Sequence, residues 1–225
     1  YTEPYNDERG RNRVFPPIAD FVKEKLYEDQ GLHCEVAKLK MDFMTRAQSL
    51  IHGDLHTGSI FINEESTKVF DPEFCFYGPM GYDIGNVIAN MIFAWANGDA
   101  AGAADFCKWV EDVLVDVINM TKEKMEKYYD EHVTDTMCRN ELYKKYYMDT
   151  IIEDTSAVAG LELIRRIVGM ANVKDITTIA DEAKRARAEK ICITAAIDFI
   201  KNRSDKKCGK CFLKTLKDAI AEVDA

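Results

Sequence analysis

The stretch that decides the fold is Ile51-His-Gly-Asp-Leu-His-Thr-Gly-Ser59. A short apolar run ends at its beginning, and a glycine then precedes the carboxylate of Asp54, with His52 and His56 on either side. An acid on a glycine-containing loop that leaves a strand can be aimed at a substrate hydroxyl. Because loops held by a rigid scaffold often carry function, we expect the functional site within residues 50–85.

A second acidic motif, Phe70-Asp-Pro-Glu-Phe74, follows shortly afterwards. On an extended chain, residues two apart project to the same face, so Asp71 and Glu73 are predicted to point the same way. Pro72 stiffens the backbone between them. Two hard oxygen ligands on one side suit Mg²⁺, which binds a few carboxylates together with nucleotide phosphates. The motif therefore predicts a magnesium site.

The two motifs together are typical of phosphoryl transfer. The protein-kinase pattern His-Arg-Asp-Leu-x-x-x-Asn places its catalytic Asp where Asp54 stands. Here Gly53 replaces the Arg, and Ser59 replaces the Asn that binds magnesium in protein kinases. We expect Glu73 to supply the missing oxygen. Either motif alone would favour an ordinary loop with solvated acids, but both in this order favour a kinase-like site.

Around these motifs the sequence predicts a mainly α protein with a small β hairpin. Apolar residues recur at three-to-four spacing over most of the chain, as on the buried face of a helix. Residues 1–17 are polar, end in Pro16-Pro17 and predict an extended lead-in. Short apolar runs predict strands at 49–52, 59–62 and 68–71, the last two forming a hairpin around Asn63–Thr67, with a Gly-rich loop at 77–81.

Helices are predicted on both sides of this β insertion. Asn97-Gly98 is expected to stop one helix, and Gly160 and Gly169 are expected to break another. The expected helical ranges are 18–29, 32–48, 82–96, 99–131, 136–171, 176–202 and 209–222.

Composition excludes several classes of partner. The chain has 225 residues, with 30 Lys plus Arg against 39 Asp plus Glu, and a formal charge of -9. This charge repels nucleic acid and anionic membranes alike, and the most apolar run, 87–96, is too short to span a bilayer. We expect neither partner. Seven scattered cysteines, an odd number, favour a reducing cytoplasm. Cys208-Gly-Lys-Cys211 is a lone pair without a nearby His, which favours helix surface over a zinc site.

The motifs carry a specific resemblance. His52-Gly-Asp-Leu-His-Thr-Gly-Ser59, followed by Asp71-Pro-Glu-Phe-Cys-Phe-Tyr-Gly-Pro-Met-Gly-Tyr-Asp-Ile-Gly85, resembles the S-methyl-5-thioribose kinases, small-molecule kinases related to aminoglycoside phosphotransferases and choline kinases. Those relatives commonly have Asn at the position of Ser59, whereas the thioribose kinases have His-Thr-Gly-Ser. The resemblance extends to Thr2-Glu-Pro-Tyr-Asn6 and to Gly160-Leu-Glu-Leu-Ile-Arg-Arg-Ile167, and so covers most of the chain.

This resemblance implies the C-terminal lobe of the protein-kinase-like, aminoglycoside phosphotransferase-like fold. It also implies ATP-dependent phosphorylation of the 1-hydroxyl of 5-methylthioribose in methionine salvage, by a cytoplasmic homodimer. Asp54 would hold and activate the sugar hydroxyl, while Asp71 and Glu73 would hold Mg²⁺. Arg165 and Arg166 would line the sugar site, although adjacent helix positions point about 100° apart, and geometry alone leaves one of them open as a surface residue. The residues implied to support the loop are His52, His56, Ser59 and Asp83.

A kinase also needs a nucleotide-binding lobe with a Gly-rich turn and a strand lysine. Only Gly10 and Gly31 precede the catalytic loop, and Glu35-Val-Ala-Lys38 lies in a helical pattern. We therefore expect residues 18–225 to form the catalytic and substrate-binding lobe, with little activity alone and with the N-terminal nucleotide-binding lobe absent from this chain. Two alternatives stay open: a related kinase for another sugar, alcohol or aminoglycoside, and a non-catalytic kinase lobe that acts as a binding module.

Overall fold

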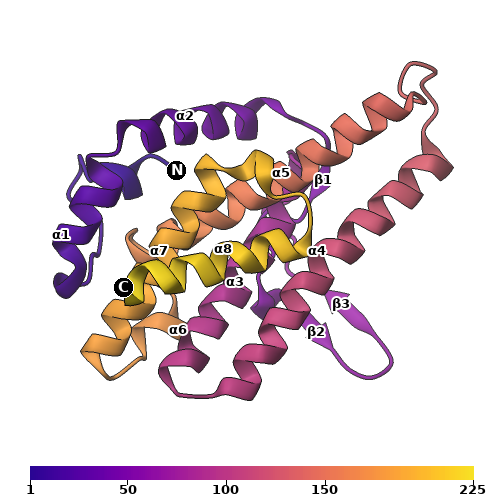
Figure 1. Ribbon diagram of the computed structural model, residues 1–225. Helices are drawn as coiled ribbons and strands as arrows, with labels where there is room; N and C mark the ends of the chain where they lie inside the picture. Colours follow the sequence, from indigo (N-terminus) through magenta and orange to yellow (C-terminus); the bar gives the residue numbers. More distant parts are fainter.

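The body of the molecule is a layered bundle of long helices, and the computed structural model describes all of residues 1–225 (Figure 1). Helix α3 packs against α4 and α5, α5 packs against α7, and α8 covers α7 and α4. The mainly α fold predicted from the sequence is confirmed. The long helices are α3 (Gly81–Ala100), α4 (Ala104–His132), α5 (Glu141–Ile167), α7 (Glu182–Lys201) and α8 (Gly209–Asp224).

Shorter helices complete the fold. The lead-in contains the 3-10 turn η1 (Glu3–Tyr5), whose Tyr5 is buried, so residues 1–17 are less extended than predicted. The expected helix 18–29 is three consecutive pieces, and the expected helix 32–48 is α2 (Gln30–Thr45), which Asp29 caps by accepting from the Leu32 amide at 2.8 Å. The remaining short elements are η2 (Pro16–Ile18), α1 (Ala19–Val22), the π-helical turn η3 (Lys23–Tyr27), η4 (Thr57–Ser59), α6 (Lys174–Thr177) and η5 (Arg203–Asp205).

Two of the predicted helix breaks are wrong because the glycines serve close packing. A Cβ at Gly160 would lie 2.5 Å from the Ala196 carbonyl oxygen, so this glycine lets α5 and α7 approach, and α5 runs unbroken through it. Gly98 likewise lies inside α3, where a Cβ would lie 2.6 Å from the ring of Phe106 on α4. The chain instead turns just after α3, at Gly102, which has a φ of +75°.

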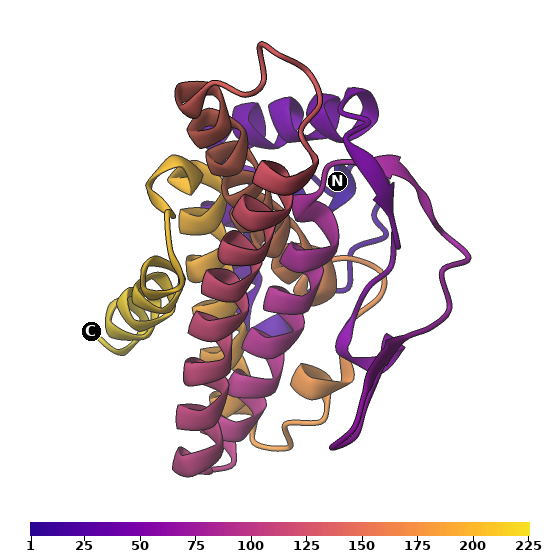
Figure 2. The same ribbon diagram turned by 90° about the vertical axis from the view of Figure 1, so that its right-hand side faces the viewer.

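The β structure consists of two separate antiparallel pairs. The predicted hairpin is confirmed: β2 (Ile60–Ile62) pairs with β3 (Thr67–Val69), and the pair projects from the helical body (Figure 2). The turn is held by the Asn63 side chain, which accepts from the Ser66 amide at 2.7 Å. The expected loop 77–81 is partly a strand, since β4 (Phe76–Gly78) pairs with β1 (Ser49–Ile51). This second pair places the start of the loop 52–59 and the end of the acidic motif 70–74 side by side.

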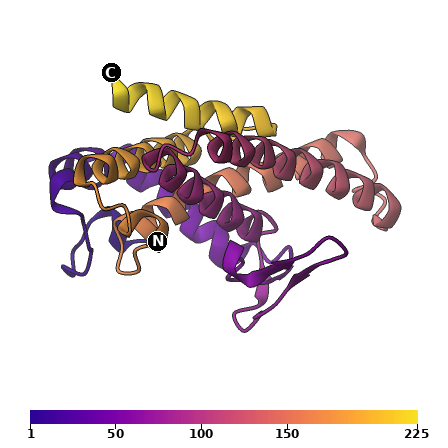
Figure 3. The ribbon, with the colours of Figure 1, turned by 90° about the horizontal axis from the view of Figure 1, so that it is seen from below.

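The core lies between the helical layers, on the side away from the hairpin. Phe93, Phe199 and Phe212 are completely buried, and the rings of the last two lie 5.3 Å apart between α7 and α8. Helix α8 forms the outer layer, opposite the β2–β3 hairpin (Figure 3). No helix combines the length and the apolar character needed to cross a bilayer. The helical body therefore acts as a rigid support for the irregular β segments.

Candidate active site

The loop after β1 is held by one carboxylate on α3. Asp83, in the first turn of α3, accepts from the His52 amide at 2.6 Å and from the Gly53 amide at 3.0 Å. Gly53 has a φ of +84°, and a Cβ there would lie 2.3 Å from the Phe74 carbonyl oxygen. Only glycine fits this position without strain. The backbone just before Asp54 is thus fixed from two sides.

The His52 side chain joins this loop to the acidic motif. Its Nε2 lies 2.9 Å from the Phe70 carbonyl oxygen, and its Nδ1 accepts from the Asp54 amide at 3.3 Å. Since a carbonyl only accepts, this arrangement requires the proton on Nε2. His52 therefore fixes the position of Asp54 relative to the residue that precedes Asp71.

The Asp54 carboxylate itself is exposed and has no hydrogen-bond or ion-pair partner. Behind it, the buried Ser59 hydroxyl lies 3.2 Å from Nε2 of His56, and the Phe70 amide donates to the Ser59 carbonyl at 3.1 Å. Ser59 and His56 thus support the loop from within. The free carboxylate remains available to a ligand.

The geometry predicted for Asp71 and Glu73 is wrong in one respect. Asp71 has a φ of +67°, and the Cys75 amide donates to the Pro72 carbonyl at 3.0 Å, so the segment is a turn and not an extended strand. The rule that residues two apart share a face does not apply to a turn. Both carboxylates are exposed and have no partner. No group of three or more metal-ligating side chains gathers anywhere in the chain.

A small polar cavity brings together four of the predicted site residues from distant parts of the sequence. It has a volume of about 130 Å³ and lies between the loop 52–59, α3 and the last turns of α5. Asp54 and His56 line this cavity together with Arg165 and Arg166. Helix geometry alone allowed one of the two arginines to be a surface residue, but both line the cavity. The full lining is Asp54, Leu55, His56, Asn86, Asn90, Glu162, Arg165 and Arg166.

The two arginines differ in how they are held. Arg165 donates from Nε to Oε2 of Glu162 at 2.6 Å and from Nη2 to Oε1 at 2.8 Å. The nearest approach of Arg166 to Glu162 is 3.9 Å, between Nε and Oε1, which is too long for a hydrogen bond. Burial opposes the charge of Arg165, but the hydrogen bonds that it donates to Glu162 outweigh this effect and raise the pKa of the guanidinium. Arg165 is therefore a fixed cation and Arg166 a loosely held one.

Sequence reasoning missed the three other polar residues of this cavity, namely Asn86, Asn90 and Glu162. Spacing offered a signal for each. Asn86 and Asn90 follow Asp83 by three and seven positions, so all three share one face of α3. Glu162 precedes the arginines by three and four positions, the spacing of helix ion pairs.

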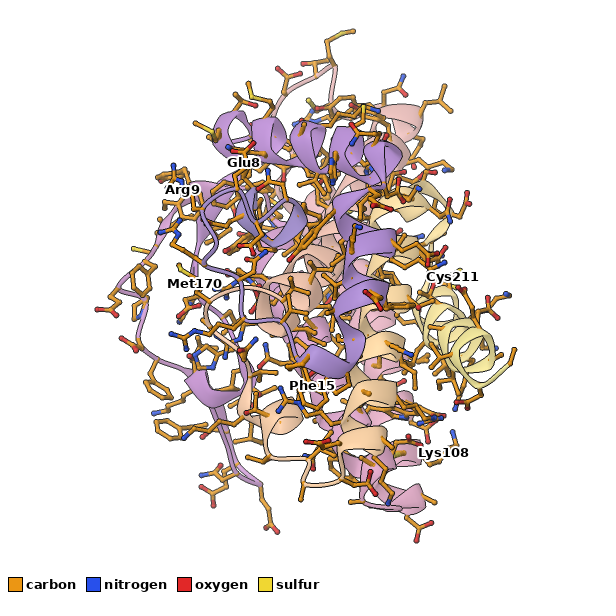
Figure 4. The ribbon with its side chains drawn as sticks, turned by 90° about the vertical axis from the view of Figure 1, so that its left-hand side faces the viewer. Glu8, Arg9, Phe15, Lys108, Met170 and Cys211 are labelled. Carbon is orange, nitrogen blue, oxygen red and sulfur yellow. The ribbon has the colours of Figure 1, made fainter.

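Two larger cavities adjoin the polar one. One, of about 510 Å³, shares Arg165 and lies against the lead-in, where Figure 4 shows Glu8, Arg9 and Met170 along one edge of the molecule. The other, of about 550 Å³, shares Leu55 and is mostly apolar, with Met80 and Tyr129 among its walls. Arg165 and Leu55 thus each form a wall shared by the polar cavity and one neighbouring cavity.

The Cys-x-x-Cys pair lies far along the fold from these residues, at the start of α8 (Figure 4). Cys208 is the N-cap residue of α8, and its Sγ lies 3.3 Å from that of Cys211. Both cysteines are half-buried and free. The pair belongs to the helix end and not to the cavity.

Comparison with known proteins identifies relatives of this chain among the phosphotransferases. The phosphotransferase enzyme family matches residues 6–114. Methylthioribose kinase 1 of Oryza sativa subsp. japonica is 37% identical over 211 residues, which cover 85% of this chain and 48% of the relative. The methylthioribose kinase of Escherichia coli O45:K1 is 33% identical over 217 residues, covering 90% of this chain and 52% of the relative. That of Exiguobacterium sibiricum is 36% identical over 208 residues, covering 92% and 52%.

These matches confirm the resemblance that the motifs predicted, to methylthioribose kinases within the kinase-like phosphotransferases. The chain spans about half the length of the curated relatives it matches.

Proposed function

We propose that this chain, a relative of the methylthioribose kinases, is the catalytic and substrate-binding lobe of an enzyme that phosphorylates the 1-hydroxyl of 5-methylthioribose with ATP. The observation that carries the proposal is the meeting of Asp54 with Arg165 and Arg166 in one polar cavity. In this proposal, residues 18–225 form the catalytic and substrate-binding lobe, residues 1–17 lead into that lobe, and the nucleotide-binding lobe is a separate part of the kinase. The half-length match to the relatives supports this division.

Asp54 has the properties needed to hold and activate a hydroxyl. Its carboxylate is free to accept the hydroxyl proton, while its backbone amide is fixed by His52. Phosphoryl transfer depends mainly on positioning and charge stabilisation. Hydrogen bonds of Asp83 and His52 provide the positioning of the loop, and the contact between His56 and Ser59 supports it from within.

The arginines supply the charge stabilisation. Guanidinium groups fork onto hydroxyl or phosphoryl oxygens and stabilise the negative charge that develops during transfer. Arg165 is oriented by Glu162, and both arginines line the cavity that contains Asp54. A sugar seated in this cavity would present its hydroxyl to Asp54 with cationic groups close by.

Asp71 and Glu73 would hold Mg²⁺. Both are exposed carboxylates without partners, and hard oxygen donors of this kind suit Mg²⁺, which completes its shell with phosphate oxygens and water. When bound there, the ion would neutralise charge on the nucleotide phosphates. The contact between His52 and the Phe70 carbonyl keeps these carboxylates in register with Asp54.

The proposal includes a cytoplasmic, homodimeric enzyme. All seven cysteines are free, which agrees with a reducing compartment. The homodimer rests on the resemblance to the family alone.

Substitution of Asp54 in the complete kinase tests the proposal. Asp54→Asn should lower kcat by about 10³-fold, within the range of general-base catalysis, without lowering the melting temperature. Glu64→Gln, an exposed acid at the hairpin turn, serves as the matched control and should leave kcat unchanged. Retained turnover in Asp54→Asn would remove this residue from the mechanism. Turnover of another sugar or alcohol in preference to methylthioribose would favour a related kinase.

The 225-residue chain alone tests the lobe assignment. Calorimetry should detect binding of 5-methylthioribose, whereas turnover with ATP and Mg²⁺ should be far below that of the complete kinase. Full turnover by this chain would overturn the assignment. Absence of both sugar binding and turnover in the complete kinase would favour a non-catalytic module.

A further inference from the structure

We propose that Glu162 is a positioning residue that divides the work of the two arginines, holding Arg165 for the sugar and leaving Arg166 free for the transferred phosphoryl group. This inference rests on the proposed function. It describes how the same site would distinguish the neutral sugar hydroxyl from the anionic phosphoryl oxygens. Nothing in the sequence motif distinguishes the two arginines, because they are adjacent and chemically identical.

The first step is the burial and reach of Glu162. Its side chain is 9% exposed, against 41% for Arg165 and 30% for Arg166. It lies one turn before the arginines on α5, so its carboxylate approaches both guanidinium groups, and it lines the cavity with them. A buried carboxylate is stable only when it is paired. The pairing that satisfies it is the two-bond contact with Arg165.

The second step is the count of hydrogen-bond donors. A guanidinium has five N–H groups in a rigid fork. Arg165 commits one from Nε and one from Nη2 to Glu162, so its orientation is fixed and its remaining donors point elsewhere. Arg166 makes no side-chain hydrogen bond, and all its donors are free. Arg165 therefore has fewer donors left for a ligand, whereas Arg166 can turn all five of its N–H groups toward the transferred phosphoryl group.

The third step is charge. The cavity contains two carboxylates, Asp54 and Glu162, and two guanidinium groups, while Asn86 and Asn90 are neutral. Glu162 offsets the charge of Arg165 at hydrogen-bond distance but contacts Arg166 only at 3.9 Å. The positive charge left without a close partner is therefore that of Arg166. A neutral sugar hydroxyl does not need this charge, but the phosphoryl group does.

A double-mutant cycle in the complete kinase tests this division. Glu162→Gln keeps the shape but cannot accept both Arg165 bonds, so KM for methylthioribose should rise about tenfold or more, with a smaller change in kcat. Because Glu162 acts through Arg165, Glu162→Gln combined with Arg165→Lys should be no worse than Arg165→Lys alone. Combined with Arg166→Lys, which should lower mainly kcat, the effects should multiply. Effects that multiply with Arg165→Lys, or a Glu162→Gln enzyme with wild-type KM, would overturn the inference.

A matched control separates positioning from general stability. Glu189 on α7 is also a buried carboxylate paired with an arginine, Arg185 at 2.8 Å, and it lines none of the cavities at the site. Glu189→Gln should change thermal stability without changing KM. If Glu162→Gln does not fold, Glu162→Asp keeps the charge at shorter reach, and its KM should lie above that of the wild type. A wild-type KM there would overturn the inference.

The two levels of proposal fail differently. If the wild-type kinase does not act on methylthioribose, the proposed function fails. If the wild type acts on it and the cycle shows no coupling between residues 162 and 165, only the role of Glu162 fails.

Discussion

The contact between Asp83 and the catalytic loop gives the most direct test of the structural reasoning. Asp83 accepts from two consecutive backbone amides, those of His52 and Gly53, at 2.6 and 3.0 Å. Hydrogen bonds to a charged group contribute about 1.5–3 kcal/mol each. Because Asp83 is only half-buried and water can partly replace it, we take the lower value, so the two bonds together contribute about 3 kcal/mol to holding the loop.

Asp83→Ala should therefore release the loop. About 3 kcal/mol corresponds to roughly a 10²-fold loss of amide exchange protection at His52 and Gly53. Asp83→Asn keeps one acceptor oxygen but turns an NH₂ group toward the other amide, so it should lose about half as much. Hydrogen exchange measured residue by residue reports these two amides directly, and urea unfolding reports how much of the loss is global.

Asp105→Asn is the matched control for this experiment. Asp105 also lies in the first turn of a long helix, α4, but is exposed and accepts no hydrogen bond. Its removal should cost only the helix-dipole contribution, about 0.3–1 kcal/mol. If Asp83→Asn and Asp105→Asn behaved alike, or if the His52 and Gly53 amides stayed protected in Asp83→Ala, the bracing role of Asp83 would be refuted.

Three further predictions concern stability and reactivity. Gly53→Ala should lower the free energy of unfolding by at least about 2 kcal/mol in urea titration, because φ is +84° and a Cβ would lie 2.3 Å from a carbonyl oxygen. Gly10→Ala is the control: Gly10 has a φ of +60° but lies in open space, so this substitution should destabilise the protein clearly less. Equal losses in the two variants would contradict the argument. Burial raises the pKa of Glu189 despite its arginine partner, so the wild type loses stability as pH rises from the unfolded pKa through the folded one. Glu189→Gln should therefore gain stability relative to the wild type as pH rises above the ordinary glutamate pKa of about 4.3, and a constant difference would count against this. Burial raises the pKa of the Cys192 thiol, whereas at Cys211 burial is outweighed by hydrogen bonding from the neighbouring thiol, which lowers the pKa. Iodoacetamide should therefore label Cys211 before Cys192 in the folded protein, as mass spectrometry can check.

The parts of the fold that could be predicted are those in which local pattern and tertiary environment agree. The β2–β3 hairpin follows from two apolar runs and the Asn63 turn, and the long helices follow from their apolar spacing. Gly160 was predicted to break a helix because local propensity treats glycine as a breaker. Its actual role depends on the Ala196 carbonyl of a helix far along the chain, which no local pattern reveals. β4 was missed for the same reason, since its partner β1 lies 25 residues earlier.

The candidate site shows a similar division. The order and spacing of the two acidic motifs predicted Asp54 and its neighbours, but Arg165 and Arg166 came only from the family resemblance. The structure brings them into one cavity with Asp54. Glu162 belongs to the same motif, but the sequence does not single it out, since an acid one turn before two arginines is also typical of a solvated helix pair. Its 9% exposure is what distinguishes it, and exposure is not written in a single sequence.

The position of His52 suggests why this loop needs a histidine at that place. The cavity with Asp54 lies against the helices, whereas Asp71 and Glu73 lie on the turn that follows the hairpin. His52 contacts both sides, accepting from the Asp54 amide and donating to the Phe70 carbonyl, one residue before Asp71. In the proposed reaction the sugar approaches from the first side and the nucleotide phosphates from the second. A shift of about 1 Å between them can cost about 10²-fold in rate. A neutral histidine can donate and accept in opposite directions across the loop, and an aliphatic residue of similar size could not hold the two sides in register.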